Sequence, residues 1–235
     1  MKVLFKEMDK KIKLITIDGD GCAFAYKTPG NFFESSWNAL GYAYNLQEKW
    51  DERIKKYYKY NSSFENDKKW AEEDVFDLTG KSYSTAEKVL YPIPYSLGFE
   101  EFIKNSRGKF IRGLLTTSFD VVAKKIEKEL NLDFVYCNLL HRENGNFKGT
   151  LDYLVPTWGK HEKIQEICRL FKICPKEICH IGDNENDISV GERVGLFISF
   201  NPKTEKIKQK AKHTIYDFRE LNNILAGYNG NTNLL

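Results

Sequence analysis

The chain has 235 residues, of which 41% are hydrophobic and 29% are charged, as in an ordinary soluble globular protein with a sizeable core. Its 36 basic and 33 acidic residues nearly cancel and leave a formal net charge of +3. No run of 18 apolar residues occurs, and residues 1–13 lack the long apolar stretch of a signal peptide. We therefore expect neither a membrane-spanning helix nor a membrane partner.

The charge pattern and the cysteines favour a cytoplasmic protein without a nucleic-acid partner. The most basic stretch, residues 47–60, also carries acidic residues, and we interpret it as the solvated face of a helix. The five scattered cysteines indicate no disulfide framework, and Cys174 and Cys179 lack the second pair or histidine cluster of a zinc site. Reduced, buried thiols are expected instead. The sequence carries no signal for an oligomeric state.

In chain order, strand-like and helix-like segments alternate. Strands are predicted over residues 13–17, 109–117, 134–140, 177–183 and 195–200, with a candidate edge strand over 213–217. Apolar residues at helical spacing predict helices over residues 119–132 and 161–173. Asn144-Gly145, after the third strand, is a strong signal for a two-residue hairpin. Strands that alternate with helices predict an α/β fold with a doubly wound parallel sheet, covered on both faces.

One long region departs from this alternation. Residues 27–95 contain only helix-like segments, the first with a candidate N-terminal cap at Glu34-Ser35-Ser36, and they hold three of the four tryptophans. We interpret this region as a small helical domain inserted after the first strand. The predicted organisation is a core of residues 1–26 and 96–228, a helical domain of residues 27–95, and a flexible tail of residues 229–235.

Polar residues that can carry chemistry follow the predicted strands. Asp18 and Asp20 end the first strand, Thr116 ends the second, and Asp183 ends the fourth. Lys160 precedes the helix that leads to the fourth strand. In an open parallel sheet, ligands bind beyond the carboxyl ends of the strands, where the strand order reverses. We therefore expect these side chains to converge.

Two non-catalytic explanations of the Asp-Gly-Asp-Gly segment, a tight turn and a calcium loop, compete with a catalytic one. Asp-Gly is common in tight turns. A calcium loop needs Asp or Asn at its fifth position and Gly at its sixth. A loop counted from Asp18 has neither residue, and one counted from Asp183 has the Asp but lacks the Gly, so neither fits. A carboxylate at a strand end can instead attack phosphorus, and a second one can protonate the leaving oxygen. Mg²⁺ suits such gathered carboxylates, among them Asp187, and a lysine and a hydroxyl can hold phosphoryl oxygens.

Four motifs resemble those of the haloacid dehalogenase superfamily of phosphohydrolases and occur in the same order. Residues 18–22 (Asp-Gly-Asp-Gly-Cys) resemble DxDx[TV], Thr116 the Ser or Thr after the second strand, Lys160 the third-motif lysine, and residues 182–187 GDxxxD. The resemblance covers about residues 13–201 and points to phosphoserine phosphatase and its relatives, which carry a helical cap between the first two motifs. It implies a Rossmann-like core with residues 27–95 as the cap.

The resemblance also assigns roles in the reaction. Asp18 would be the nucleophile and a Mg²⁺ ligand. Asp20 would be the general acid and then the base, with its backbone carbonyl on the metal. Thr116 and Lys160 would bind the phosphoryl group. Asp183 would ligate Mg²⁺, and Asp187 would stand behind the ligands of the metal.

The substrate contacts that the resemblance implies are less regular. Thr117 would offer its backbone N–H to phosphate, Asn186 matches the family's asparagine, and Glu34 would hold a substrate ammonium group. An alignment without a gap puts Lys27 in place of that glutamate, and Ala71 replaces the arginine that grips the phosphoserine carboxylate. The identity of the phosphomonoester is therefore left open.

The sequence thus predicts a Mg²⁺-dependent phosphatase that hydrolyses a small phosphomonoester through an aspartyl phosphate. A phosphotransferase or mutase with the same nucleophile and a non-catalytic phospholigand-binding protein stay as alternatives. The aromatic residues of the predicted cap are expected to form its own core, with a substrate cage as the alternative: Trp37, Tyr44, Trp50, Tyr57 and Trp70.

Overall fold

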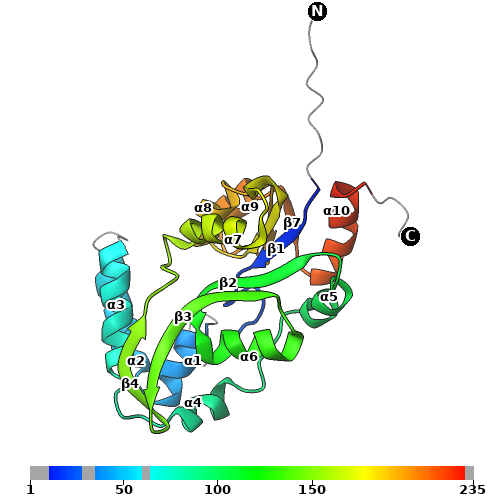
Figure 1. The fold of residues 1–235 in the computed structure, drawn as a ribbon. Coiled ribbons are helices and arrows are strands. Elements are labelled where there is room, and N and C mark those ends of the chain that lie inside the picture. The colour runs from blue at the N-terminus through cyan, green and yellow to red at the C-terminus, as the bar shows by residue number, and fades with distance from the viewer. Residues whose placement is uncertain (1–10, 28–34, 60–63, 231–235) are drawn as a thin grey trace, which may run out of the picture.

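The computed structural model describes residues 11–27, 35–59 and 64–230, at whose centre lies a seven-stranded sheet in the order β4-β3-β2-β1-β5-β6-β7 (Figure 1). All neighbouring pairs are parallel except β3 and β4. The predicted doubly wound α/β sheet is thereby confirmed. The strands are β1 Leu14–Ile17, β2 Ile111–Phe119, β3 Phe134–Glu143, β4 Asn146–Asp152, β5 Ile178–Gly182, β6 Leu196–Phe200 and β7 His213–Ile215.

The strand order reverses at β1, which pairs with β2 on one side and with β5 on the other. Ile17, the last residue of β1, pairs with Leu114 of β2 and with Ile181 of β5. Residue 18 therefore leaves the sheet beside the carboxyl end of β5 and beside the middle of β2, which continues past it. A reversal of this kind opens the crevice in which ligands of doubly wound sheets bind.

The predicted hairpin joins β3 to β4. Asn144 and Gly145 have φ angles of 50° and 78°, and two successive positive φ angles are the signature of a type I′ turn. The hairpin makes β4 an antiparallel edge strand, an element that the sequence prediction had not placed as a strand. The edge of β4 lies against α3 (Phe64–Phe76), so the hairpin reaches the helices that follow β1.

Helices cover both faces of the sheet (Figure 1). Ile15 and Ile17 of β1 share one buried cluster with Ile126 of α6, whereas Leu14 packs with Ile164 of α7. Successive strand side chains point to opposite faces, so β1 is buried on both of its faces. One face of the sheet carries α5 Phe99–Asn105, α6 Asp120–Leu130 and α10 Leu221–Tyr228, and the other α7 Lys163–Phe171, α8 Ile188–Gly191 and α9 Glu205–Lys210.

Among the described residues, no helix is both long and apolar enough to cross a membrane.

The described residues between 35 and 90 form helices and short connections and no strand, as predicted, and are called the helical insertion below. Its Trp37 stacks on Trp70 with ring centroids 4.8 Å apart, and lies 4.0 Å from the ring of Phe119 at the end of β2. One hydrophobic cluster therefore joins the insertion to the sheet. The division of the chain into core and cap domains stays a prediction. The helices of the insertion are α1 Ser36–Ala43, α2 Gln47–Lys59, α3 Phe64–Phe76 and α4 Tyr83–Leu90.

The end of α10 is tied to the segment before β1. Asn229 accepts a hydrogen bond from the backbone N–H of Ile12 at 2.9 Å and donates one to the Ile12 carbonyl at 3.2 Å. The predicted tail, residues 229–235, thus begins with an anchored side chain, and residues 231–235 lie outside the described residues.

Candidate active site

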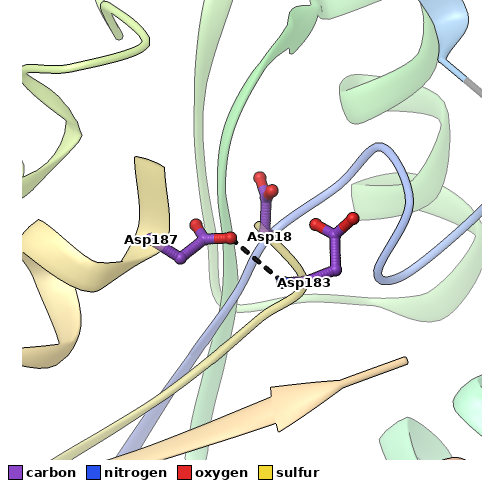
Figure 2. A group of neighbouring side chains, drawn as sticks. All are labelled: Asp18, Asp183 and Asp187. Atoms are coloured by element: carbon purple, nitrogen blue, oxygen red, sulfur yellow. Dashed lines mark hydrogen bonds between the residues drawn. The ribbon is translucent and has the colours of Figure 1, made fainter. Parts of the chain in front are cut away.

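Three carboxylates meet at the carboxyl ends of β1 and β5 (Figure 2). Asp18 directly follows β1, Asp183 directly follows β5, and Asp187 ends the short turn of helix over Glu185–Asp187. One oxygen of each can be chosen so that all three lie within 4.8 Å of one another, and all three residues are buried. The structure therefore brings together three of the residues that the sequence predicted, from segments more than 160 positions apart.

Glycines let the backbone pass close to these carboxylates. A Cβ on Gly19 would lie 2.4 Å from Thr116 Oγ1, and one on Gly21 would lie 2.3 Å from Asp183 Oδ2. Gly21 also has a φ angle of +82°, which side chains disfavour. A Cβ on Gly182 would meet the carboxyl group of Asp187 at 2.3 Å. Both acidic motifs therefore need glycine because their backbone passes close to active-site side chains, and not only because Asp-Gly favours a turn.

Lys160 lies fully buried between two of the carboxylates. Its Nζ is 2.8 Å from Asp18 Oδ1 and 2.7 Å from Asp187 Oδ1. Burial alone would lower the pKa of this lysine, but the two carboxylates outweigh burial and raise the pKa above its ordinary value. The ammonium group is therefore charged, and it holds Asp18 in place.

Asp187 is held from several sides at once. Its Oδ2 accepts hydrogen bonds from the backbone N–H groups of Asp183 at 3.1 Å and Asn184 at 3.3 Å. Its Oδ1 lies 3.2 Å from Nε2 of His180, in addition to the contact with Lys160. Burial would raise the pKa of Asp187, but Lys160 and His180 outweigh it and hold the pKa well below its usual range. Asp187 is therefore an ionised support for the site.

His180 is a further support that no sequence motif marks. It is fully buried in β5, and its Nδ1 lies 2.9 Å from Thr16 Oγ1, on the other side of the ring from Asp187. Thr16 and His180 are paired residues of β1 and β5. The signal that could have found this link is their shared register, which requires the strand order to be known.

Asp183 is the least satisfied of the three carboxylates. Burial raises its pKa to about 8, against the attraction of Lys203, whose Nζ lies 2.9 Å from Asp183 Oδ2. Within the described part of the chain, Asp183 Oδ1 is buried without a hydrogen-bond donor. A buried carboxylate oxygen without a donor is costly, and a hard cation with oxygen ligands would satisfy it. Sequence reasoning did not single out Lys203.

Asp20 faces the helical insertion. The backbone N–H of Ser36 donates to Asp20 Oδ1 at 2.6 Å, and the Ser36 hydroxyl donates to Oδ2 at 2.9 Å. Burial raises the pKa of Asp20 to about 6, although both hydrogen bonds from Ser36 oppose the rise. The Ser36 hydroxyl also lies 2.6 Å from that of Ser118. Asp20 thus lies near the carboxylate cluster and bonds to a residue that the sequence did not assign to the site.

A pocket of about 340 Å³ opens over Asp18, Asp20 and Asp183, and both Thr117 and Asn186 line it. Thr116 is fully buried, and its hydroxyl accepts a hydrogen bond from the N–H of Ser118 at 3.1 Å. Glu34 lies outside the described residues. The pocket is also lined by Ser35, Trp37, Asn38, Ile54, Lys55, Trp70, Tyr153, Thr157, Asn184 and Lys203.

A doubly wound sheet with acidic motifs at its reversal and a lysine between them is the arrangement that the resemblance to haloacid dehalogenase phosphohydrolases predicted. Residues 47–225 match the family model described as haloacid dehalogenase-like hydrolase. The chain belongs to this family.

Phosphoserine phosphatases are prominent among its relatives. The enzyme of Archaeoglobus fulgidus is 29% identical over 146 residues, which are 61% of this chain and 42% of that protein. The enzyme of Methanocaldococcus jannaschii is 30% identical over 141 residues, 59% of this chain and 66% of that protein. The matched part thus spans less than two thirds of either relative. A solved phospho-aspartyl intermediate analogue of a phosphoserine phosphatase has a TM-score of 0.74 and 25% identity, covering 92% of this chain and 99% of that chain.

Proposed function

We propose that this protein is a Mg²⁺-dependent phosphatase that hydrolyses a small phosphomonoester through an aspartyl phosphate on Asp18. The observation that carries the proposal is the position of Asp18. Its carboxylate lies at the reversal of the strand order, 2.8 Å from the ammonium group of Lys160, and lines a pocket together with Asp20. A purely structural carboxylate would need neither the pocket nor the second acid.

In the first half of the reaction Asp18 is the nucleophile. The N–H of Gly19 and the ammonium of Lys160 both donate to Oδ1, at 2.8 Å each, and orient the carboxyl group. We assign the attack on phosphorus to the other oxygen, Oδ2. As the bond from Oδ2 to phosphorus forms, the bond from phosphorus to the ester oxygen breaks, and Asp20 gives that oxygen a proton.

In the second half a water attacks the aspartyl phosphate, and Asp20 accepts the proton of that water. Inorganic phosphate leaves, and the Asp18 carboxylate and the protonated Asp20 are restored. A pKa of about 6, set by burial and by the two hydrogen bonds from Ser36, suits a group that gives and takes a proton near neutral pH.

The donor set suits Mg²⁺. The carboxylates of Asp18 and Asp183 and the backbone carbonyl of Asp20 would be its ligands, and the donor-free Oδ1 of Asp183 supports this assignment. Asp187 would stay behind them, because Lys160 and two backbone N–H groups already occupy its oxygens. The bound ion would offset the negative charge gathered by the carboxylates and the phosphoryl group.

The remaining phosphoryl contacts come from Lys160 and from β2. The register of β2 against β3 shifts between Leu115 and Phe119, so Thr116 and Thr117 lie in an irregular stretch of the strand. We assign the Thr116 hydroxyl and the Thr117 backbone N–H to the phosphoryl oxygens. Asn186, whose side-chain oxygen is buried without a donor in the described structure, lines the same pocket and would contact the substrate.

The test is phosphate release from a panel of phosphomonoesters, in Mg²⁺ and in EDTA, by the wild-type chain and by Asp18→Asn. Release that needs Mg²⁺ and disappears in the variant is expected. Circular dichroism and the urea midpoint of the variant show whether it is folded. Metal-dependent release by a folded Asp18→Asn protein would overturn the assignment of the nucleophile, and no release from any ester by the wild type would overturn the proposed activity.

A further inference from the structure

Part of the wall that the helical insertion contributes to the pocket is apolar. Trp37 of α1, Ile54 of α2 and Trp70 of α3 line the same pocket as Asp18 and Asp20. The two indole rings are 7% and 8% exposed and stack at 4.8 Å with 30° between their planes, so the wall is packed rather than loose. Trp37 and Trp70 thus belong to the buried core and also line the site.

The described residues of this wall offer one cationic side chain to the pocket and no carboxylate. Within the described part of the insertion, Lys55 is the charged residue that lines the pocket, and no carboxylate does. The nearby carboxyl group of Asp67 is occupied, because it accepts hydrogen bonds from the Tyr153 hydroxyl at 2.5 Å and from the N–H of Thr157 at 2.8 Å. Among the described residues of the insertion, a substrate ammonium group therefore finds no free carboxylate on this wall.

One polar atom of the wall lacks a partner. Among the described residues, Nε1 of Trp70 is buried without a hydrogen-bond acceptor, whereas Nε1 of Trp37 donates to the Thr117 carbonyl at 3.4 Å. Buried indole N–H groups are normally paired, and an indole can only donate. An acceptor on a bound ligand would satisfy this atom.

We propose that Trp37, Ile54 and Trp70 form the subsite for the leaving alcohol, and that they select a flat ring bearing a hydrogen-bond acceptor for Trp70 Nε1. The substrate class is then a phosphate ester of an alcohol that carries a heteroaromatic ring. This inference rests on the proposed phosphatase function and adds its specificity. A pocket of about 340 Å³ has room for such a ring beside the phosphoryl group.

The experiment compares esters whose leaving alcohols have similar basicity: propyl phosphate, 2-phenylethyl phosphate, 2-(pyridyl)ethyl phosphates and phosphoserine. At mildly alkaline pH, where pyridine is neutral, kcat/KM for the phenyl ester should exceed that for the propyl ester by about tenfold or more. At least one pyridyl isomer should exceed the phenyl ester by several-fold. Trp70→Phe keeps a ring but removes the N–H, so it should abolish the advantage of pyridyl over phenyl.

Trp50→Phe is the matched control. Trp50 is buried in the same insertion and donates to Asp77 at 3.2 Å, but it does not line the pocket. Both ester ratios should stay unchanged in this variant. Equal loss of the pyridyl advantage in Trp50→Phe and Trp70→Phe would assign it to the folding of the insertion and overturn the role of Trp70.

Binding separates this inference from the proposed chemistry. Calorimetry with 3-phenylpropylphosphonate and butylphosphonate, which cannot be hydrolysed, should show at least about tenfold tighter binding of the ring-bearing compound. Tighter binding of the ring-bearing compound without phosphate release from any ester would overturn the proposed activity but support the subsite. Metal-dependent release with no preference for a ring, or a preference for phosphoserine over the phenyl ester, would overturn the subsite and leave the phosphatase standing.

Discussion

Asp20 and Ser36 are joined by two hydrogen bonds, one from the Ser36 backbone N–H at 2.6 Å and one from its hydroxyl at 2.9 Å. Ser36 is the first residue of α1, so the second acid of the DGDG motif is bonded directly to the start of the helical insertion. The position of the insertion and the protonation of Asp20 are therefore linked through one side chain.

In Ser36→Ala, the rise in the activation free energy calculated from kcat should exceed the fall in the free energy of unfolding. The variant loses the hydroxyl bond to Asp20 but keeps the backbone bond, so Asp20 is held less firmly for proton transfer. The loss of one hydrogen bond to a charged group corresponds to about a tenfold decrease in kcat. The measurement is steady-state phosphate release together with urea unfolding. The control is Ser106→Ala, which removes another buried hydroxyl, bonded to the Ile103 carbonyl at 3.0 Å. Equal effects of the two variants on kcat would contradict a specific role of Ser36.

Lys160→Met should destabilise the protein as well as inactivate it. The substitution leaves the buried carboxylates of Asp18 and Asp187 without their shared cation, and the loss of one partner from a buried ion pair costs about 3 kcal/mol or more. Urea unfolding in EDTA measures the change in the free energy of unfolding. Lys208→Met is the matched control, because Lys208 is about half exposed and pairs only loosely with Glu205. A change under about 1 kcal/mol for Lys160→Met would show that the pair is not ionised as described.

Removal of the metal should reveal the part that Lys203 plays. In EDTA the ammonium group of Lys203 is a cationic neighbour of the buried Asp183, so Lys203→Gln should lower Tm. When Mg²⁺ is bound it supplies that positive charge, and the difference in Tm between variant and wild type should shrink. Thermal unfolding of both proteins in EDTA and in saturating Mg²⁺ checks this. A difference of equal size in both conditions would mean that Lys203 acts independently of the metal site.

The stability of the protein should depend on Glu177 at neutral but not at acidic pH. The backbone N–H of Cys174 donates to its carboxylate at 2.8 Å, and Lys13 lies 2.5 Å away. The bond from Cys174, with help from Lys13, lowers the pKa of Glu177 to about 2. A depressed carboxyl pKa means that the stabilisation is complete above the ordinary value of about 4.5 and is lost as the pH falls towards 2.

Glu177→Gln should therefore cost about 1 kcal/mol at pH 7, and the gap to wild type should narrow steadily as the pH is lowered below the ordinary carboxyl range. Urea unfolding at a series of pH values measures both proteins. Glu205→Gln is the control, since Glu205 is largely exposed and its distance to Lys208 is 3.7 Å. A gap that widens in acid would show that the sign of the pKa shift is wrong.

The sequence by itself determined the fold class and the meeting of the acidic motifs. Strands that alternate with helices must form a parallel sheet, and the carboxyl ends of parallel strands share one edge. Asp18, Asp183 and Asp187 follow such strands, so their convergence could be predicted without coordinates. The residue types also predicted a Mg²⁺ site with oxygen ligands, which stays a prediction. The Asn144-Gly145 hairpin was predictable for a local reason, because its two positive φ angles suit those residues.

Only the tertiary structure decided which ordinary residues support the site. Thr16 and His180 meet because β1 and β5 are neighbours in a particular register, and Lys203 reaches Asp183 from beyond β6. Trp37 and Trp70 are buried like core residues, yet both line the pocket. Such contacts join segments far apart in the chain through residue types that occur everywhere, and no local pattern marks them. Their physical origin is packing, which depends on where whole helices and strands lie.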